Sequence, residues 1–221
     1  MSTARRFSQD HFKGPPGSTE LILVRHGASA DAVEGESFEL LEGQGDPPLS
    51  EMGRRQAELV AERLIREDFE AIYISNLRRT AETAAPLATR SGLTPIVEAD
   101  LREVFLGEWE GGLFRQKIVD QDPLAQQMFA EQRWDVIPGA EPSADFGARL
   151  HGAVARLAAA HVDSCAVVFS HGGAIGEIMV QATGAAPFAF IAADNTSISR
   201  LIVAPDRWYV RGFNETAHLI T

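Results

Sequence analysis

Three successive residues, Arg25, His26 and Gly27, place a cation and an imidazole directly after the apolar run of residues 21–24. Four aliphatic residues cut off in this way indicate a buried parallel strand whose carboxyl end opens into a loop. Ligands of α/β sheets bind at that edge. The triplet suggests an anion site with a nucleophile in it, although a histidine hydrogen-bonded within a turn is the simpler interpretation of an isolated Arg-His-Gly.

The same arrangement recurs near the other end of the chain. Residues 165–170 form a second apolar run, which ends in His171, Gly172 and Gly173, and a helix is predicted to follow at once. Because the carboxyl ends of parallel strands share one edge of a sheet, the two histidines are expected at the same edge.

A third short apolar run, residues 71–75, leads to Arg78 at the predicted start of a helix. Helix N-termini attract anions through free N–H groups and the macrodipole, so an arginine there strengthens the preference for a phosphate. An ordinary exposed arginine is the alternative interpretation of Arg78.

The elements that must position these residues follow from hydrophobic periodicity and capping residues. A mobile leader is predicted for residues 1–19, then one α/β domain from residue 20 onward. Residues 28–48 are interpreted as a long surface loop, and residues 104–142 as an irregular insertion that forms a lid or a separate hydrophobic cluster. Helices are predicted at 50–67, from 78 onward, at 143–160 and at 173–183, and a terminal β-hairpin at 196–203 and 207–213.

Composition narrows the function classes. The formal net charge of −11 argues against nucleic acid or an anionic membrane as the main partner, because both require clustered Lys and Arg. The apolar runs are far shorter than the roughly 18 residues of a membrane span, and the N-terminus lacks the core of a signal peptide. We therefore expect a soluble, cytoplasmic protein. The single cysteine, Cys165, excludes an intramolecular disulfide and a cysteine-based metal cluster.

In this order, the motifs make the chain resemble the histidine phosphatase superfamily, the phosphoglycerate mutase-like proteins, and within it the phosphatase branch. The resemblance extends from about Leu21 to the C-terminus. Residues 49–57 resemble the family's helix start Leu-Ser/Thr-x-x-Gly-x-x-Gln-Ala, residues 101–111 its segment with the acid residue, and residues 214–219 its usual ending. The implied fold is a three-layer α/β/α sandwich, with a mostly parallel central sheet and helices on both faces.

The resemblance implies His26 as a nucleophile that forms a phosphohistidine, with its other ring nitrogen donating to a nearby acceptor. Arg25, Arg78 and His171 would stabilise the transferring phosphoryl group, with His171 cationic when phosphate is bound. The predicted substrate-binding residues are Arg25, Gly27, Ser29, Arg78, His171 and Gly172.

Glu103 is by resemblance the general acid and base, although spacing alone does not separate it from Glu108 and Glu110. A distant branch of the family places an Asp directly after the second histidine for this role. Gly172 occupies that position, which favours Glu103. No metal and no other cofactor are expected, because the motifs of metal-dependent phosphatases and of serine hydrolases are missing.

The predicted function is hydrolysis of a small phosphorylated metabolite. Mutase activity is the alternative, and a catalytically silent protein that binds phosphorylated ligands is a further one. A mutase needs extra cations for doubly phosphorylated intermediates, whereas residues 28–48 have none and the insertion offers only Arg115, Lys117 and Arg133. The family's mutases also carry Glu-Ser-Thr-Trp-Asn after Arg-His-Gly, and residues 28–32 here lack that phosphate-binding amide. A homodimer is compatible with the terminal strands.

Overall fold

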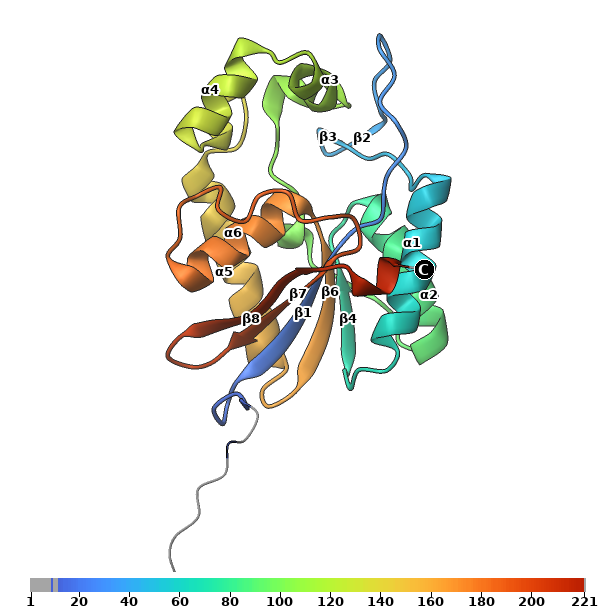
Figure 1. Ribbon diagram of the computed structural model, residues 1–221, viewed down its shortest axis with the longest axis vertical. Coiled ribbons are helices and arrows are strands. Elements are labelled where there is room, and N and C mark those ends of the chain that lie inside the picture. Colours follow the sequence, from blue (N-terminus) through green and yellow to red (C-terminus); the bar gives the residue numbers. More distant parts are fainter. Residues whose placement is uncertain (1–8, 10–11, 221) are drawn as a thin grey trace, which may run out of the picture.

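The computed structural model describes residue 9 and residues 12–220, and its centre is a six-stranded sheet (Figure 1). The strand order is β5-β4-β6-β1-β7-β8. The first four strands are parallel, and β7 and β8 run antiparallel to their neighbours. Their bounds are β1 (Thr19–Arg25), β4 (Ala71–Ile74), β5 (Ile96–Val97), β6 (Cys165–Ser170), β7 (Ile198–Val203) and β8 (Trp208–Glu215). The mostly parallel sheet confirms the predicted fold class.

Helices cover both faces of this sheet, as Figure 1 shows. One face packs on α1 (Glu51–Leu64) and α2 (Arg78–Ser91), and the other on α5 (Ser143–Ala160) and α6 (Gly172–Thr183). Side chains of a strand alternate between faces, so Ile22 and Val24 join the core under α1 and α2, whereas Leu21 and Leu23 join the core under α5 and α6. This burial of β1 on both faces explains its continuous apolar run.

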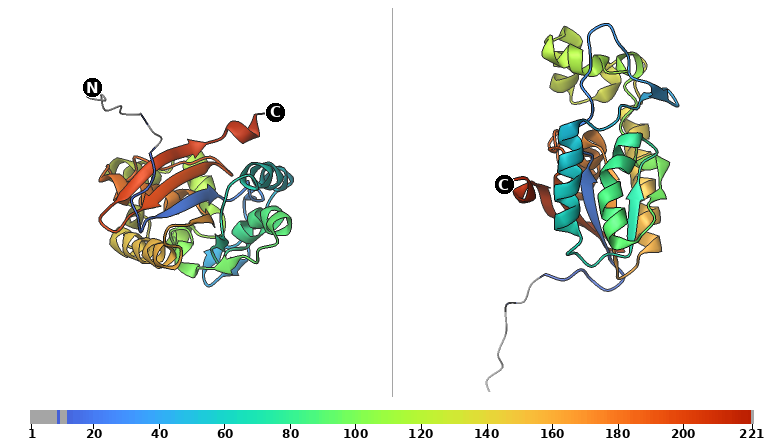
Figure 2. Two further views of the ribbon diagram at one scale, coloured as in Figure 1. Left: turned by 90° about the horizontal axis from the view of Figure 1, so that it is seen from below. Right: turned by 90° about the vertical axis from the view of Figure 1, so that its right-hand side faces the viewer.

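Two insertions lie together beyond the carboxyl end of the sheet, as Figure 1 and the right-hand view of Figure 2 show. The predicted surface loop 28–48 contains a small hairpin, β2 (Leu40–Leu41) and β3 (Gln44–Gly45), with Gln44 buried. The segment 104–142, expected to be irregular, contains α3 (Leu113–Val119) and α4 (Pro123–Glu131). These helices are too short to show a periodic pattern of apolar residues, so the sequence did not predict them. Short 3-10 helices complete the fold: η1 (Ala99–Leu101), η2 (Gly107–Trp109), η3 (Trp134–Val136) and η4 (Ala217–Leu219).

The chain ends can be described only in part. Residues 1–8 and 10–11 of the predicted leader lie outside the described residues, while Thr19 belongs to β1. The Phe12 ring lies 5.4 Å from the ring of Tyr209 in β8. Among the described residues, no helix has the length and apolar character that crossing a membrane requires.

Candidate active site

The pairing of β1 with β6 brings the two predicted histidines together. These strands are parallel neighbours in which Arg25 lies opposite Ser170, so His26 and His171 each follow directly at the carboxyl edge of the sheet. The backbone N–H of His26 donates to the Ser170 carbonyl at 3.0 Å. The two imidazole rings lie 5.2 Å apart, centroid to centroid, in an edge-to-face arrangement.

His26 is oriented by its own loop. Its Nδ1 lies 2.7 Å from the Gly27 carbonyl oxygen, the acceptor contact expected from the sequence. When Nδ1 carries the proton and donates it to this carbonyl, Nε2 keeps its lone pair. The ring also lines a pocket, so the lone pair is available to a molecule bound there.

The loop after His26 rests tightly on α1 and α2. The Gly27 N–H donates to Thr83 Oγ1 at 3.0 Å, and the Ala28 N–H donates to Gln56 Oε1 at 2.9 Å. A Cβ atom on Gly53 would lie 1.9 Å from the Ala28 carbonyl oxygen, and one on Gly27 would lie 2.6 Å from the Gly53 carbonyl oxygen. The glycine of the predicted Leu-Ser-x-x-Gly helix start is therefore needed for close approach of two backbones.

His171 lies behind His26 and is completely buried. Its Nε2 lies 2.8 Å from Ser75 Oγ, at the end of β4, and its Nδ1 has no hydrogen-bond partner among the described residues. Burial, followed by the charge of Arg79, holds the pKa of both imidazoles well below the ordinary value. Both rings are therefore neutral near pH 7 in this structure.

The cation predicted at the start of α2 is displaced by one residue. Arg78 is 40% exposed and does not line the pocket; its Nη2 donates to the Asp46 carbonyl at 2.7 Å and lies 3.3 Å from Glu39. Arg79 lines the pocket instead and is buried, which lowers its pKa to about 10. One residue turns a helical side chain by about 100°, so the expectation for Arg78 is corrected to Arg79.

Arg25 and Arg115 are the other guanidinium groups that line the pocket in the described part of the chain. Arg25 donates to the Ala193 carbonyl, and its buried Nε has no partner there. Arg115, from α3, donates through Nη2 to Ser29 Oγ at 2.6 Å and through Nη1 to the Ala30 carbonyl at 2.8 Å. Sequence reasoning counted Arg115 among the cations of the insertion without placing it at the site.

Four other predicted binding residues lie beside the pocket rather than on its surface: Gly27, Ser29, His171 and Gly172. Ser29 holds Arg115, as described above, and is itself buried. Gly172 is the first residue of α6, and a Cβ atom there would lie 3.3 Å from Arg25 Nε. Ser29 therefore contacts a cation of the pocket, and Gly172 leaves room for one.

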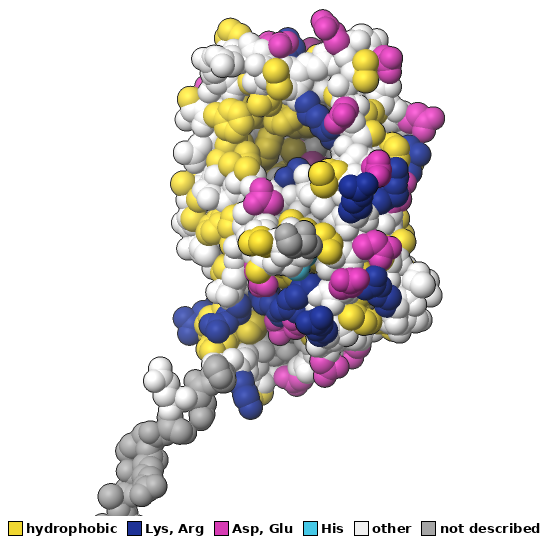
Figure 3. Space-filling view, turned by 45° about the vertical axis from the view of Figure 1, so that its right-hand side comes forward, with side chains coloured by type: hydrophobic (Ala, Val, Ile, Leu, Met, Phe, Trp, Pro, Cys, Tyr) yellow, Lys and Arg dark blue, Asp and Glu magenta, His cyan; other side chains and the backbone are white. Residues whose placement is uncertain are grey.

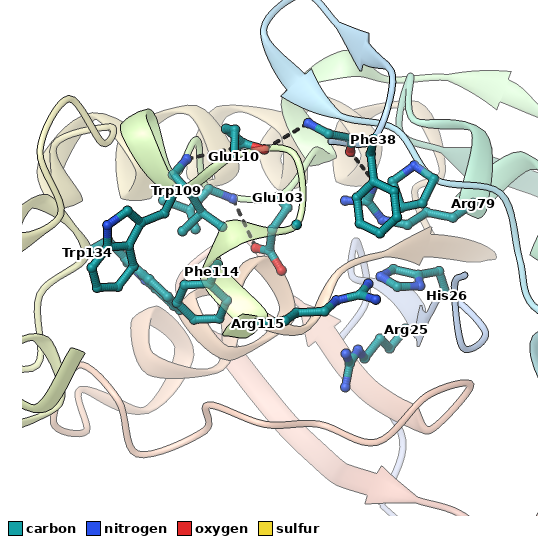
Figure 4. A pocket seen from close by; sticks show the side chains of 15 residues that line it. Arg25, His26, Phe38, Arg79, Glu103, Trp109, Glu110, Phe114, Arg115 and Trp134 are labelled. Atoms are coloured by element: carbon teal, nitrogen blue, oxygen red, sulfur yellow. Dashed lines mark hydrogen bonds between the residues drawn. The ribbon is translucent and has the colours of Figure 1, made fainter. Parts of the chain in front are cut away.

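Glu103 is the acidic residue whose carboxylate faces the pocket next to the first turn of α6 (Figure 4). It accepts hydrogen bonds from the N–H groups of Gly173 at 2.9 Å and Ala174 at 3.0 Å. Glu110 also lines the pocket, and both of its oxygens accept backbone N–H groups, from Gly45 and Leu106, just as both oxygens of Glu103 do. Burial raises the pKa of Glu110. Glu108 is exposed and outside the lining, so position excludes it. Of the two carboxylates that line the pocket, Glu103 is the one bound to the first turn of α6, which follows His171.

The pocket encloses about 250 Å³ between the sheet edge and the two insertions. Figure 3 shows it as a hollow with yellow hydrophobic side chains on one side and blue and magenta charges on the other. Figure 4 shows Arg25, His26 and Arg115 together at one end. Across the described residues, no group of three or more His, Cys, Asp or Glu side chains is arranged to hold a metal ion.

A mixed α/β sheet with paired imidazoles and converging guanidinium groups at one edge defines the class of enzymes that act on phosphoryl groups through histidine. The family model of the histidine phosphatase superfamily (branch 1) matches residues 21–216. The chain belongs to this family of phosphoryl-transfer and hydrolysis enzymes, as its motifs predicted.

Some relatives are named as phosphoglycerate mutases and others as phosphatases. A probable phosphoglycerate mutase GpmB of Yersinia pestis is 30% identical over 207 residues, which cover 90% of this chain and 94% of the relative. The structure of a mycobacterial glucosyl-3-phosphoglycerate phosphatase is 30% identical, with a TM-score of 0.73 over 90% of this chain and 100% of that one. A phosphoglycerate mutase of Bacillus anthracis shares the fold, with a TM-score of 0.78 and 18% identity over 92% of this chain and 96% of that one.

Proposed function

We propose that the chain is a metal-independent phosphomonoesterase that hydrolyses a small phosphorylated metabolite through a phosphohistidine at His26. The observation that carries this proposal is the meeting of Arg25, His26, Arg79 and Glu103 around one pocket, with His171 buried directly beside His26. These residues come from four separate segments of the chain. This set supplies a nucleophile, charge stabilisation and a proton carrier without a further group.

In the first step, Nε2 of His26 attacks phosphorus, the P–N bond forms and the bond to the leaving oxygen breaks. Glu103, in its protonated form, gives its proton to that oxygen. The contact from His26 Nδ1 to the Gly27 carbonyl keeps the attacking lone pair on Nε2 throughout. In the second step, a water attacks phosphorus, the P–N bond breaks, and the Glu103 carboxylate takes the proton of the water.

The guanidinium groups of Arg25 and Arg79 would stabilise the negative charge of the transferring phosphoryl oxygens. The unpartnered Nε of Arg25 and Nδ1 of His171 are buried donors or acceptors that a bound anion would satisfy. A dianion next to His171 favours the protonated imidazole, so phosphate binding would oppose the depression of its pKa by burial.

A phosphoglycerate mutase-type transfer is the alternative, and Arg115 is the observation that favours it, because it adds a third guanidinium group to the pocket. The other two cations of the insertion do not reinforce it. Lys117 pairs with Asp122 at 2.7 Å, Arg133 pairs with Asp135 at 3.0 Å, and neither lines the pocket. Discharge of the phosphoenzyme to water therefore fits the charge distribution better than discharge to a second anionic ester.

The test is hydrolysis of p-nitrophenyl phosphate by the full chain in the presence of a chelator. We expect turnover that falls by about 10³-fold or more in His26→Ala, and an acid-labile, alkali-stable phosphoenzyme in the wild type. Transfer of label from that phosphoenzyme to 2- or 3-phosphoglycerate rather than water would establish the mutase instead. Binding of phosphate without turnover would establish the catalytically silent alternative, and restoration of activity by a divalent metal would contradict metal independence.

A further inference from the structure

The pocket has two chemically different ends. The imidazole and guanidinium groups gather at the sheet edge, whereas Trp109, Phe114 and Trp134 of the insertion form a wall on the other side of Glu103 (Figure 4). We call these three residues the aromatic wall. A phosphoryl group held at His26 leaves the rest of its ester facing this wall.

The aromatic wall is fixed in place before any ligand binds. The rings of Trp109 and Phe114 lie 6.2 Å apart, those of Phe114 and Trp134 also 6.2 Å, and Trp134 packs at 4.9 Å on Phe188. Trp109 and Trp134 are 5% and 9% exposed and belong to the core under α5 and α6. An apolar ligand therefore gains contact with preformed surfaces and orders few side chains in return.

No cation lines the aromatic side of the pocket among the described residues. Lys117 lies over the Trp109 ring, 6.0 Å from its centroid, but outside the pocket lining, where it pairs with Asp122. Arg133 pairs with Asp135 outside the pocket, and Arg115 reaches back to Ser29 and Ala30 beside the phosphoryl end. The carboxylate on this side is Glu110, whose pKa is raised by burial. Both of its oxygens accept hydrogen bonds from backbone N–H groups. A second anionic group on the substrate would meet aromatic faces and a carboxylate here.

The pocket is partly open to solvent, and its volume shows what it can accommodate. Its volume is about 250 Å³, and a dry cavity of about 150 Å³ in another protein accommodates one benzene molecule. The remaining ~100 Å³ suffices for a phosphoryl group, since a water molecule takes about 30 Å³ of liquid volume. The pocket therefore has room for one six-membered ring plus a phosphoryl group.

On the basis of the proposed function, we propose that the natural substrate is a phosphomonoester whose alcohol carries one apolar or aromatic ring and no second anionic group. The ring packs against the aromatic wall, and its burial there holds the ester oxygen near Glu103. The phosphoryl oxygens meet Arg25 and Arg79.

The test compares benzyl phosphate with ethyl phosphate, whose leaving alcohols have similar acidity, so that the ratio of their kcat/KM values reports on packing of the ring. We expect benzyl phosphate to be favoured by about 10- to 100-fold, from burial of one ring-sized apolar group. We expect 3-phosphoglycerate to be a poorer substrate than benzyl phosphate. A ratio near one, or a preference for 3-phosphoglycerate, would overturn the inference.

Two variants test whether the aromatic wall causes the preference for benzyl phosphate. Phe114→Ala removes the half-buried ring of the aromatic wall and should lower the benzyl-to-ethyl ratio by about fivefold or more. Phe129→Ala is the matched control, because Phe129 lies in the same insertion, is 45% exposed and does not line the pocket. An equal loss of the ratio in both variants, or in neither, would contradict the placement of the ring.

Binding of benzylphosphonate and ethylphosphonate, measured by calorimetry, separates the inference from the function on which it rests. These compounds cannot be hydrolysed, so their ratio of Kd values reports the aromatic wall even if the chain turns over no ester. Equal Kd values would overturn the inference while leaving the phosphatase in place, and tight benzylphosphonate binding without turnover of any ester would overturn the phosphatase alone.

Discussion

The sheet edge and the insertion build one pocket by different means. At the sheet edge, Arg25 and His26 end β1, and His171 ends the neighbouring strand β6, so the ladder of β1 and β6 sets their distance. In the insertion, residues 104–142 reach the pocket through short helices and packed rings. The nucleophile His26 and the cation Arg25 therefore lie on the most regular part of the fold. The surface that faces the leaving group belongs to its least regular part.

This difference separates chemistry from selectivity. A buried sheet fixes side chains within a narrow range of positions, which a transferring phosphoryl group requires of its donors. Loops and short helices tolerate sequence change, so the insertion is the part where relatives with the same chemistry can acquire different substrates. We therefore expect substitutions at the sheet edge to change turnover, and substitutions in the insertion to change substrate preference.

The largest expected effect at the sheet edge distinguishes two adjacent arginines. Arg79→Ala should lower kcat/KM for p-nitrophenyl phosphate by about 10³-fold, because it removes a buried guanidinium group that faces the phosphoryl oxygens. Arg78→Ala should change it by less than about threefold, because that side chain binds Asp46 and Glu39 outside the pocket. Steady-state kinetics of both variants measures the difference, and a larger loss in Arg78→Ala would restore the sequence-based assignment.

The same pair of arginines shows which features of the site could be predicted from the sequence and which could not. Arg25, His26, Glu103 and His171 could be located because apolar runs mark the strands and the motifs mark the ends. The start of α2 could also be located, but which of two successive arginines faces the pocket depends on the rotation of the helix against the sheet. Packing of Thr83, Ala84 and Leu87 determines that rotation, and residue type alone does not.

The insertion shows a second reason why part of the site could not be predicted from the sequence. Arg115 reaches the site through a contact with Ser29, which lies 86 positions away, and Gln44 is buried because its amide donates to the Glu103 carbonyl at 2.9 Å. Such long-range contacts leave no periodic pattern. The helices α3 and α4, of seven and nine residues, are likewise too short to show one.

A second prediction concerns the joint between the two regions. Arg149 of α5 is 11% exposed, pairs with Glu141 at 2.7 Å and donates to the carbonyls of Asp100, Arg102 and Glu103. Arg149→Leu leaves a buried carboxylate and three carbonyls without their donor, so the free energy of unfolding should fall by about 3 kcal/mol. Urea denaturation followed by circular dichroism measures this change.

The matched control for that prediction is Arg156→Leu on the same helix. Arg156 pairs with Glu98 and Asp100 but is 52% exposed, so its loss should cost less than about 1 kcal/mol. Equal destabilisation by the two substitutions would mean that the segment carrying Glu103 does not depend on the buried pair, and that the sheet edge and the insertion are held together elsewhere.

The smallest expected effect is the pH dependence, which tests the sheet edge by itself. Burial and Arg79 hold the pKa values of His26 and His171 well below the ordinary value, so the nucleophile stays unprotonated as the pH falls through 6.5. Corrected for ionisation of the substrate, kcat/KM should change by less than about threefold between pH 7.5 and pH 6.5. The same pKa values affect stability. In the unfolded chain both imidazoles take up protons over that pH range and below it, whereas in the folded chain they do not. The free energy of unfolding should therefore decrease as the pH falls from about 7 toward the folded-state pKa values. Inorganic phosphate should oppose this decrease by favouring protonated His171. Turnover that declines with a midpoint at or above pH 6.5, in protein shown by circular dichroism to be folded, would mean that the imidazoles at the sheet edge are solvated rather than buried.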